Sequence, residues 1–199
     1  MSQPEGMFPG TGMPDSDWWT ALFPDPAGIV DAAGVDAGMH VVDLCCGDGH
    51  FTPALAQRAA RVTAIDLDPA LMAITRSRME GIDHCEFVVG DAYDLGALLT
   101  VRADLVFLAN AFHGVPDKVR LSRAVGETLN RDGTFAILNW NARPRDETVL
   151  LGEPRGPATA MRMTPQSVVE IVSRAGFVAQ PVIDVPPYHY LSRFRISSV

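Results

Sequence analysis

A glycine turn and the acids that follow it are the residues whose types and spacing point most directly to chemistry. Gly47 and Gly49 follow an apolar run ending near Asp43, and glycines let a backbone approach a ligand closely. Asp66 ends a second run, where a carboxylate can accept both hydroxyls of a ribose. Asp91 ends a third, within reach of an adenine amino group. Each has a structural alternative, a tight turn or a helix cap, but together they indicate a nucleoside site.

Candidate catalytic groups follow later in the chain. His113 lies just past the fourth apolar run, and a neutral imidazole can take a proton from a hydroxyl, amine or thiol. Its alternative role is to help cap a helix starting at Pro116. Tyr188 and His189 lie between the last two strand-like segments and are expected to border an acceptor pocket. Their alternative is a proline-stiffened hairpin with stacked aromatic rings.

The elements that must position these residues are apolar runs of strand length alternating with helical segments. Such alternation predicts right-handed βαβ units and a mostly parallel sheet with helices on both faces. Because only Pro186 to His189 joins the last two segments, one of them must run antiparallel. The predicted strands are 39–44, 61–65, 85–89, 103–109, 135–140, 177–185 and 190–197, and helices are predicted to begin near Ser16, Ala27, Phe51, Asp68, Pro116 and Thr164.

Length and composition limit the classes of protein to which this chain can belong. With 199 residues, 47% of them hydrophobic, we predict one domain over residues 15–199, preceded by a flexible arm over residues 1–14. The sequence lacks both a bilayer-length apolar stretch and a secretory signal pattern, so we expect a cytoplasmic protein without membrane contact. A formal charge of −8, with Lys118 the only lysine, disfavours nucleic acid as a partner. The three cysteines have neither disulfide nor zinc spacing, and no metal is expected.

Five ordered segments contain the glycine turn, the three acids and His113. They read VVDLCCGDGHFT, VTAIDLDPALM, FVVGDAYDL, ADLVFLANAFHGVPD and LNRDGTFAIL, from about Met39 to Leu138. In this order and spacing they resemble the motifs of class I S-adenosylmethionine-dependent methyltransferases, and are most similar to the small-molecule type that includes the ubiquinone and menaquinone methyltransferases. The resemblance implies a Rossmann-like, doubly wound α/β fold with a mostly parallel seven-stranded sheet and an antiparallel last strand.

The resemblance also implies how S-adenosylmethionine would be bound. The usual first glycine of the turn is Cys45 here, a residue with a side chain at a point where the family has none. A dinucleotide is disfavoured, because Thr52 stands where a third Gly or Ala would be needed. The residues implied are Asp43, Gly47 and Gly49 for the methionine moiety, Asp66 for the ribose, Asp91 and Ala92 for the adenine and Asn110 under the sulfonium, with Cys45 and Leu67 also at the site.

The expected reaction is in-line transfer of a methyl group to a small molecule, in which orientation can supply roughly 7–11 kcal/mol. A base, for which His113, Tyr188 and His189 are the candidates, is needed only if the acceptor holds its proton. The alternatives are a non-catalytic S-adenosylmethionine-binding regulatory module and an RNA or protein methyltransferase.

Three further expectations concern the surroundings of this site. Trp18 and Trp19 either roof it or form a docking surface. Residues 141–163 carry four arginines and three acids, a net charge too small to predict an anionic acceptor. We expect a monomer or homodimer.

Overall fold

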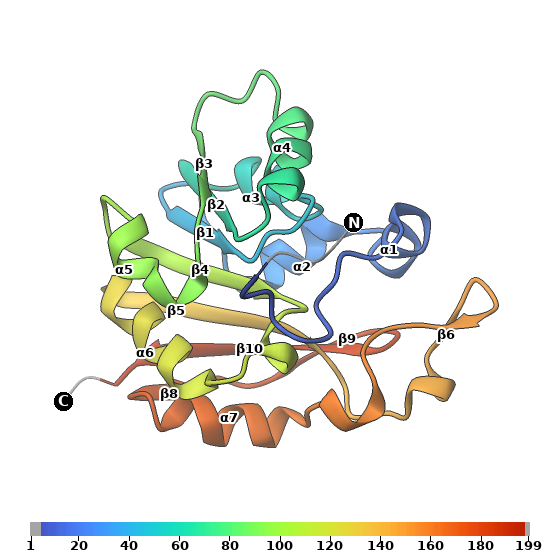
Figure 1. The fold of residues 1–199 in the computed structure, drawn as a ribbon. Helices are drawn as coiled ribbons and strands as arrows, with labels where there is room; N and C mark the ends of the chain where they lie inside the picture. The colour runs from blue at the N-terminus through green and yellow to red at the C-terminus, as the bar shows by residue number, and fades with distance from the viewer. Residues whose placement is uncertain (1–4, 198–199) are drawn as a thin grey trace.

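The computed structural model describes residues 5–197 and is built on one twisted sheet (Figure 1). Within these residues its eight strands follow the order β3-β2-β1-β4-β5-β10-β8, with β9 also paired to β10. The first five are parallel neighbours, whereas β10 runs antiparallel to β5, β8 and β9. The strands are β1 His40–Leu44, β2 Arg61–Asp66, β3 Cys85–Val89, β4 Ala103–Ala109, β5 Leu129–Trp140, β8 Phe177–Ala179, β9 Ile183–Val185 and β10 His189–Ile196.

The predicted mostly parallel sheet with an antiparallel last strand is therefore confirmed. One strand was predicted over residues 177–185, and the structure divides it into β8 and β9. Pro181 lies in the break and has no N–H to give to a ladder, which accounts for the interruption. The predicted strand 135–140 is longer than expected, because β5 begins at Leu129 and its early part pairs with β4 across a register shift.

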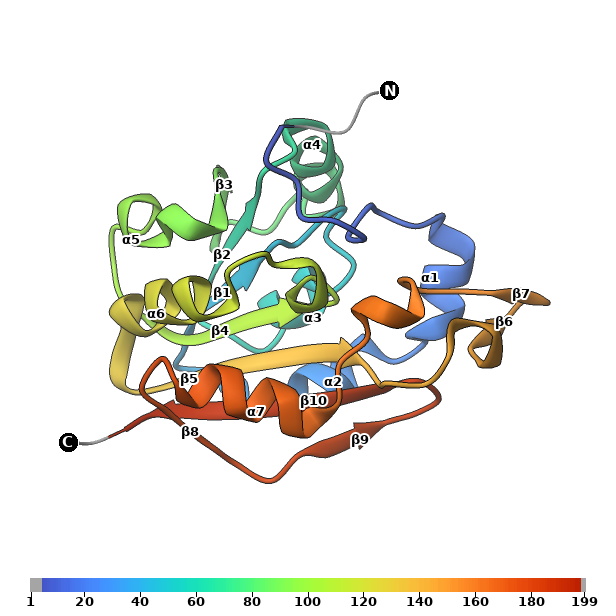
Figure 2. The ribbon, with the colours of Figure 1, turned by 60° about the horizontal axis from the view of Figure 1, so that its bottom comes forward.

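Helices cover both faces of the sheet, as predicted (Figure 2). Residues of β4 show why: Leu105 and Phe107 pack into the core under α1, α2 and α3, and Val106 and Leu108 into the core under α5, α6 and α7. The α-helices are α1 Ser16–Leu22, α2 Pro26–Ala33, α3 Thr52–Ala56, α4 Pro69–Arg78, α5 Leu95–Leu98, α6 Lys118–Thr128 and α7 Pro165–Ser173, and the 3₁₀ turns are η1 Ala92–Asp94, η2 Phe112–Gly114, η3 Arg145–Glu147 and η4 Thr159–Met161.

Helix starts follow local capping chemistry. Asp68 and Thr164 cap α4 and α7 through their side-chain oxygens, and a proline follows each of them. The cap of α6 is Asp117, whose carboxylate accepts from Arg120 N. The alternative role for His113 as a cap of this helix is therefore wrong.

Two segments outside the sheet reach its carboxyl-end edge. Residues 141–163, between β5 and α7, contain η3, η4 and a small hairpin of β6 Val149–Leu150 and β7 Glu153–Pro154, and β6 contacts α1. Residues 5–14 of the predicted arm line the same region, while residues 1–4 of the arm and 198–199 of the predicted domain lie outside the described residues. Among residues 5–197, no helix has the length and apolar character needed to cross a bilayer.

Candidate functional site

A cavity of about 280 Å³ lies where β1, β2, β3 and β4 end. One half is lined by the glycine turn and the strand-end acids. The other is lined by α1, the end of β5, Arg145 and residues 155–157, and the arm crosses both. Ligands of doubly wound sheets bind at this edge, where the carboxyl ends of the strands meet.

The glycine turn begins at a buried acid. Asp43 is 2% exposed, and its Oδ2 accepts a hydrogen bond of 2.6 Å from Thr52 Oγ1. Burial raises the pKa of Asp43 to about 7, against the lowering effect of that hydrogen bond. Thr52 thus orients the carboxylate. From the sequence alone, Thr52 was considered only because it stands where a dinucleotide site would have a glycine or alanine. Its hydroxyl, nine residues after Asp43, could have indicated this hydrogen bond.

The turn itself requires left-handed backbone. Gly47 and Gly49 have φ of 59° and 80°, and Cys45 adopts φ 56° although it has a side chain. Gly47 and Cys45 line the cavity. Gly49 is absent from the described lining, and a Cβ there would come within 2.7 Å of Thr75, so this glycine lets the turn pack against α4.

The second and third acids are held differently. Asp66 Oδ2 accepts from Gly47 N at 2.8 Å and its Oδ1 from Asp68 N at 2.9 Å, which ties the end of β2 to the glycine turn. Burial raises the pKa of Asp66. Asp91 Oδ1 accepts from Tyr93 N at 2.9 Å, so it also acts as a cap. Both acids line the cavity together with Leu67 and Ala92.

His113 lines the cavity and is 5% exposed. Its Nδ1 lies 3.2 Å from Asn139 Oδ1, and its Nε2 lies 3.1 Å from Gly10 O in the arm. Gly10 O and Asn139 Oδ1 both only accept, so the single proton of a neutral ring lies either on Nε2, toward the arm, or on Nδ1, toward Asn139. Burial lowers the pKa of His113, which favours the neutral ring. When the Gly10 contact is released and the proton lies on Nδ1, toward Asn139 Oδ1, the Nε2 lone pair is free to act as a base.

Asn110 and His189 form a second buried pair. Asn110 lines the cavity at the end of β4 with φ 56°, and its Oδ1 lies 2.9 Å from His189 Nε2. Asn110 Nδ2 is buried without a hydrogen-bond partner among the described residues. His189 is 1% exposed, packs on Trp140 and Phe23, and burial holds its pKa well below the usual value.

Tyr188 lies on the far side of an indole. It stacks on Trp140 at 6.3 Å between ring centroids, and its hydroxyl donates to Val149 O at 2.8 Å. Trp140 lines the cavity, but Tyr188 and His189 are not part of the described lining. The structure thus differs from the expectation that these two side chains border the pocket directly.

Several lining residues were missed as site residues by the sequence reasoning. His50 lines the cavity, and its position directly after Gly49 in the glycine turn could have indicated this. Arg145 and Arg155 come from the irregular segment after β5, which has no motif. Trp18 and Trp19 also line the cavity, which agrees with the expectation that they roof the site.

Comparison with known proteins agrees with this geometry. Residues 41–133 match a family model described as a methyltransferase domain. These residues, just under half of the chain, are similar to methyltransferase domains. A ubiquinone biosynthesis O-methyltransferase of Xanthomonas oryzae pv. oryzae is 30% identical over 137 residues, which cover 64% of this chain and 57% of that protein. The trans-aconitate 2-methyltransferase of Escherichia coli is 35% identical over 106 residues, covering 51% of this chain and 40% of that protein.

A solved structure shows how far the fold of the methyltransferase domain extends. The crystal structure of an S-adenosylmethionine-dependent methyltransferase from Aquifex aeolicus superposes with a TM-score of 0.76 at 21% identity, covering 90% of this chain and 93% of that one. The chain spans about half the length of the curated relatives it matches. The Aquifex aeolicus protein is named for its dependence on S-adenosylmethionine.

The lining residues fit this cofactor. Asp43, Asp66 and Asp91 have no ion-pair partner among residues 5–197, so their carboxylates are free to accept from a cationic amino group or from hydroxyls. The unpartnered Asn110 Nδ2 supplies a buried donor at the same wall.

Proposed function

We propose that this protein transfers the methyl group of S-adenosylmethionine to a small-molecule acceptor. The observation that carries the proposal is a single cavity that joins unpaired strand-end acids to a second half lined by aromatic, histidine and arginine side chains. The two curated relatives above are named for O-methylation in ubiquinone biosynthesis and for methylation of trans-aconitate, which supports a small-molecule acceptor.

In this proposal the acids divide the cofactor between them. Asp43, with the backbone of Gly47, accepts from the methionine moiety, and Cys45 lies beside it. Asp66 accepts the ribose hydroxyls, since each of its oxygens has a lone pair left after its backbone hydrogen bond. Asp91 accepts from the adenine amino group. The remaining assignments are Leu67 and Ala92 against the nucleoside, Gly49 in holding the turn and Asn110 beneath the sulfonium.

The cofactor supplies an electrophilic methyl group when bound, and the chain supplies orientation and a dry site. Trp140 and Trp19, 2% and 7% exposed, exclude water from the acceptor half. Once the contact with Gly10 is released and the ring proton lies on Nδ1, toward Asn139 Oδ1, the free Nε2 of His113 accepts a proton from the acceptor. His189 and Tyr188 act as positioning residues, His189 by holding Asn110 and Tyr188 by holding Trp140.

The proposal is tested by titrating S-adenosylmethionine calorimetrically and then measuring radiolabelled methyl transfer to a panel of small acids, phenols and amines. Asp66→Ala should lose at least two hydrogen bonds to a charged acceptor, roughly 3 kcal/mol or about 100-fold in affinity. Asp83→Ala, an exposed acid on the β3 side of the sheet, is the matched control. Unchanged affinity in Asp66→Ala would contradict the binding mode. Tight binding with no transfer to any acceptor would instead favour a regulatory module.

The surroundings expected from the sequence belong to the same proposal. A cytoplasmic location and a monomeric or homodimeric state are proposed, and light scattering of the purified chain tests the second.

A further inference from the structure

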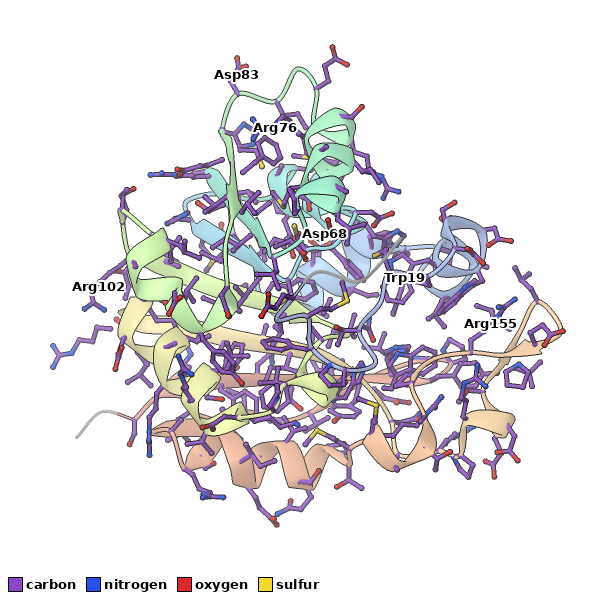
Figure 3. All side chains as sticks on the ribbon, in the orientation of Figure 1. Trp19, Asp68, Arg76, Asp83, Arg102 and Arg155 are labelled. Carbon is purple, nitrogen blue, oxygen red and sulfur yellow. The ribbon has the colours of Figure 1, made fainter. Side chains whose placement is uncertain are left out.

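The acceptor half of the cavity has a charge that the sequence did not predict. Arg145 and Arg155, from residues 141–163, both line it. Figure 3 shows Arg155 on the same side of the molecule as Trp19 of α1. Arg155 lies over the ring of Trp18, with its Cζ 5.4 Å from the centroid, so the guanidinium and the indole form one wall.

The two guanidinium groups are only partly used by the protein. Arg145 Nε donates to Gly156 O at 3.0 Å, and Arg155 Nε donates to Leu150 O at 3.4 Å. Their terminal nitrogens make no hydrogen bond within residues 5–197. A guanidinium held by Nε still presents two terminal N–H groups in a fork that matches a carboxylate.

No carboxylate neutralises these arginines. The ion pairs among the described residues are Arg58–Asp31, Arg61–Glu86 and Arg78–Asp48, all away from this segment. The three acids of residues 141–163 are exposed and unpaired. The small net charge of the segment therefore hides an uneven placement: Arg145, although exposed, and Arg155 line the cavity, whereas none of the three acids does.

A buried arginine fixes this arrangement. Arg162 is 8% exposed, and its Nη2 donates to Thr148 Oγ1 at 2.9 Å and to Arg155 O at 2.8 Å. Its Nε donates to Pro157 O, and its guanidinium lies 4.8 Å over the ring of Trp140. Burial and the nearby charge of Arg145 lower the pKa of Arg162, as expected for a cation with no acid beside it. The backbone that carries Arg155 is thus held rigidly, and the local potential is positive.

The walls between the arginines and the cofactor half are flat and aromatic. Trp140 closes the end of β5, and Gly156 packs so tightly on it that a Cβ would come within 2.7 Å of the indole. Trp18 forms a second flat surface. A planar, conjugated body can lie flat against such an aromatic wall more closely than a branched one.

We propose that the methyl acceptor is a small planar organic acid, whose carboxylate is bound by Arg155 with Arg145 and whose conjugated body lies against Trp18 and Trp140. This rests on the proposed function, because it concerns the acceptor half of the same cavity. The two halves then have opposite polarity, with acids toward the cationic cofactor and arginines toward the anionic acceptor.

The experiment uses the full chain saturated with S-adenosylhomocysteine, the demethylated product, and matched probe pairs that differ only in charge. The probes are benzoate and benzamide, 4-hydroxybenzoate and 4-hydroxybenzamide, and trans-cinnamate and cinnamamide, with binding followed by tryptophan fluorescence and calorimetry. At least one acid should bind about tenfold more tightly than its amide, the effect of one charge-assisted hydrogen-bond pair. Arg155→Gln should reduce that preference to less than about threefold, Arg155→Lys should retain part of it, and the exposed Arg143→Gln is the control.

The outcomes separate the two proposals. If S-adenosylhomocysteine binds but no acid binds better than its amide, the acid acceptor is overturned and the proposed function stands. Preference for the acid that persists in Arg155→Gln also overturns it. If S-adenosylhomocysteine itself does not bind, the result contradicts the proposed function, on which the acid acceptor depends.

Discussion

The two halves of the cavity are built in different ways. The cofactor half is formed by short turns directly after β1, β2, β3 and β4, and its acids are tied to backbone N–H groups or to Thr52. The acceptor half is formed by segments that are far apart in the chain: the arm, α1, the end of β5, Arg145 and residues 155–157. The shape of the cofactor half therefore depends on local backbone geometry, and the shape of the acceptor half on long-range packing. Substitutions in each half test this difference.

The largest effect is expected from Gly47→Val. The residue has φ 59°, and a Cβ there would come within 2.8 Å of Met13 Sδ. A valine disfavours this left-handed turn and fills space beside the cavity, so affinity for S-adenosylmethionine should fall about 100-fold in calorimetry, roughly 2.7 kcal/mol of binding free energy. Gly152→Val, at φ 80° with open space around it, is the control for strain alone. Equal affinity in the parent and Gly47→Val would show that the cofactor does not approach this backbone.

The next effect is a pH dependence from Asp43, whose pKa is raised to about 7 in the unliganded protein. A cationic ligand group favours the carboxylate, so binding should release a proton and weaken about tenfold per pH unit below pH 7. The stability of the free protein has the opposite pH dependence, because the Asp43 carboxyl loses its proton more readily in the unfolded chain than in the folded one. Stability contributed by protonated Asp43 should therefore be lost as pH rises from about 4 to 7.

Calorimetry in two buffers of different ionisation enthalpy measures the proton release. Asp43→Asn should bind more weakly and show no such release. Proton uptake, or an affinity independent of pH between 5 and 7, would contradict a role for this carboxylate.

A smaller effect is expected in the acceptor half from Gly114→Ala. A Cβ there would lie 2.1 Å from Pro9 O, so the arm must shift and His113 loses its contact with Gly10. We expect about threefold weaker acceptor binding, a loss near 0.6 kcal/mol, and faster proteolysis within residues 5–14. Gly126→Ala, in α6, is the control. Unchanged proteolysis would show that the arm does not depend on this contact.

The smallest effect is expected from Cys45→Gly. Relief of the left-handed strain at φ 56° should raise the free energy of unfolding by about 1 kcal/mol in urea denaturation. Affinity for S-adenosylmethionine should stay within about twofold, since the backbone already has the conformation that a glycine would adopt. A loss of stability would mean that the packing of the Cys45 side chain outweighs the strain.

The cofactor half could be predicted from sequence because one apolar run and one acid mark each strand end. Asp43, Asp66 and Asp91 all lie at the cavity, because successive parallel strands bring their carboxyl ends to one edge. The division of residues 177–185 into two strands could be anticipated only from Pro181, and the early start of β5 has no apolar signal.

The acceptor half could not be predicted in the same way. Arg145 and Arg155 reach the cavity because Arg162 and Thr148 bind the backbone of an irregular segment, which no periodicity reveals. The arm was predicted from its composition to be flexible, and that stays a prediction. Its position across the cavity depends on contacts with Gly47, Gly114 and His113 that join residues far apart in sequence.

The paired thiols of the glycine turn have a consequence for chemical self-protection. Cys45 and Cys46 line a cavity proposed to hold an electrophilic methyl donor, and a thiolate there would be methylated in place of the acceptor. Burial, reinforced by the neighbouring carboxylates, raises the pKa of both thiols well above the usual value. Both sulfurs therefore remain protonated and poorly nucleophilic. Burial, to which the neighbouring acids add, thus limits methylation of the protein's own thiols in the proposed reaction.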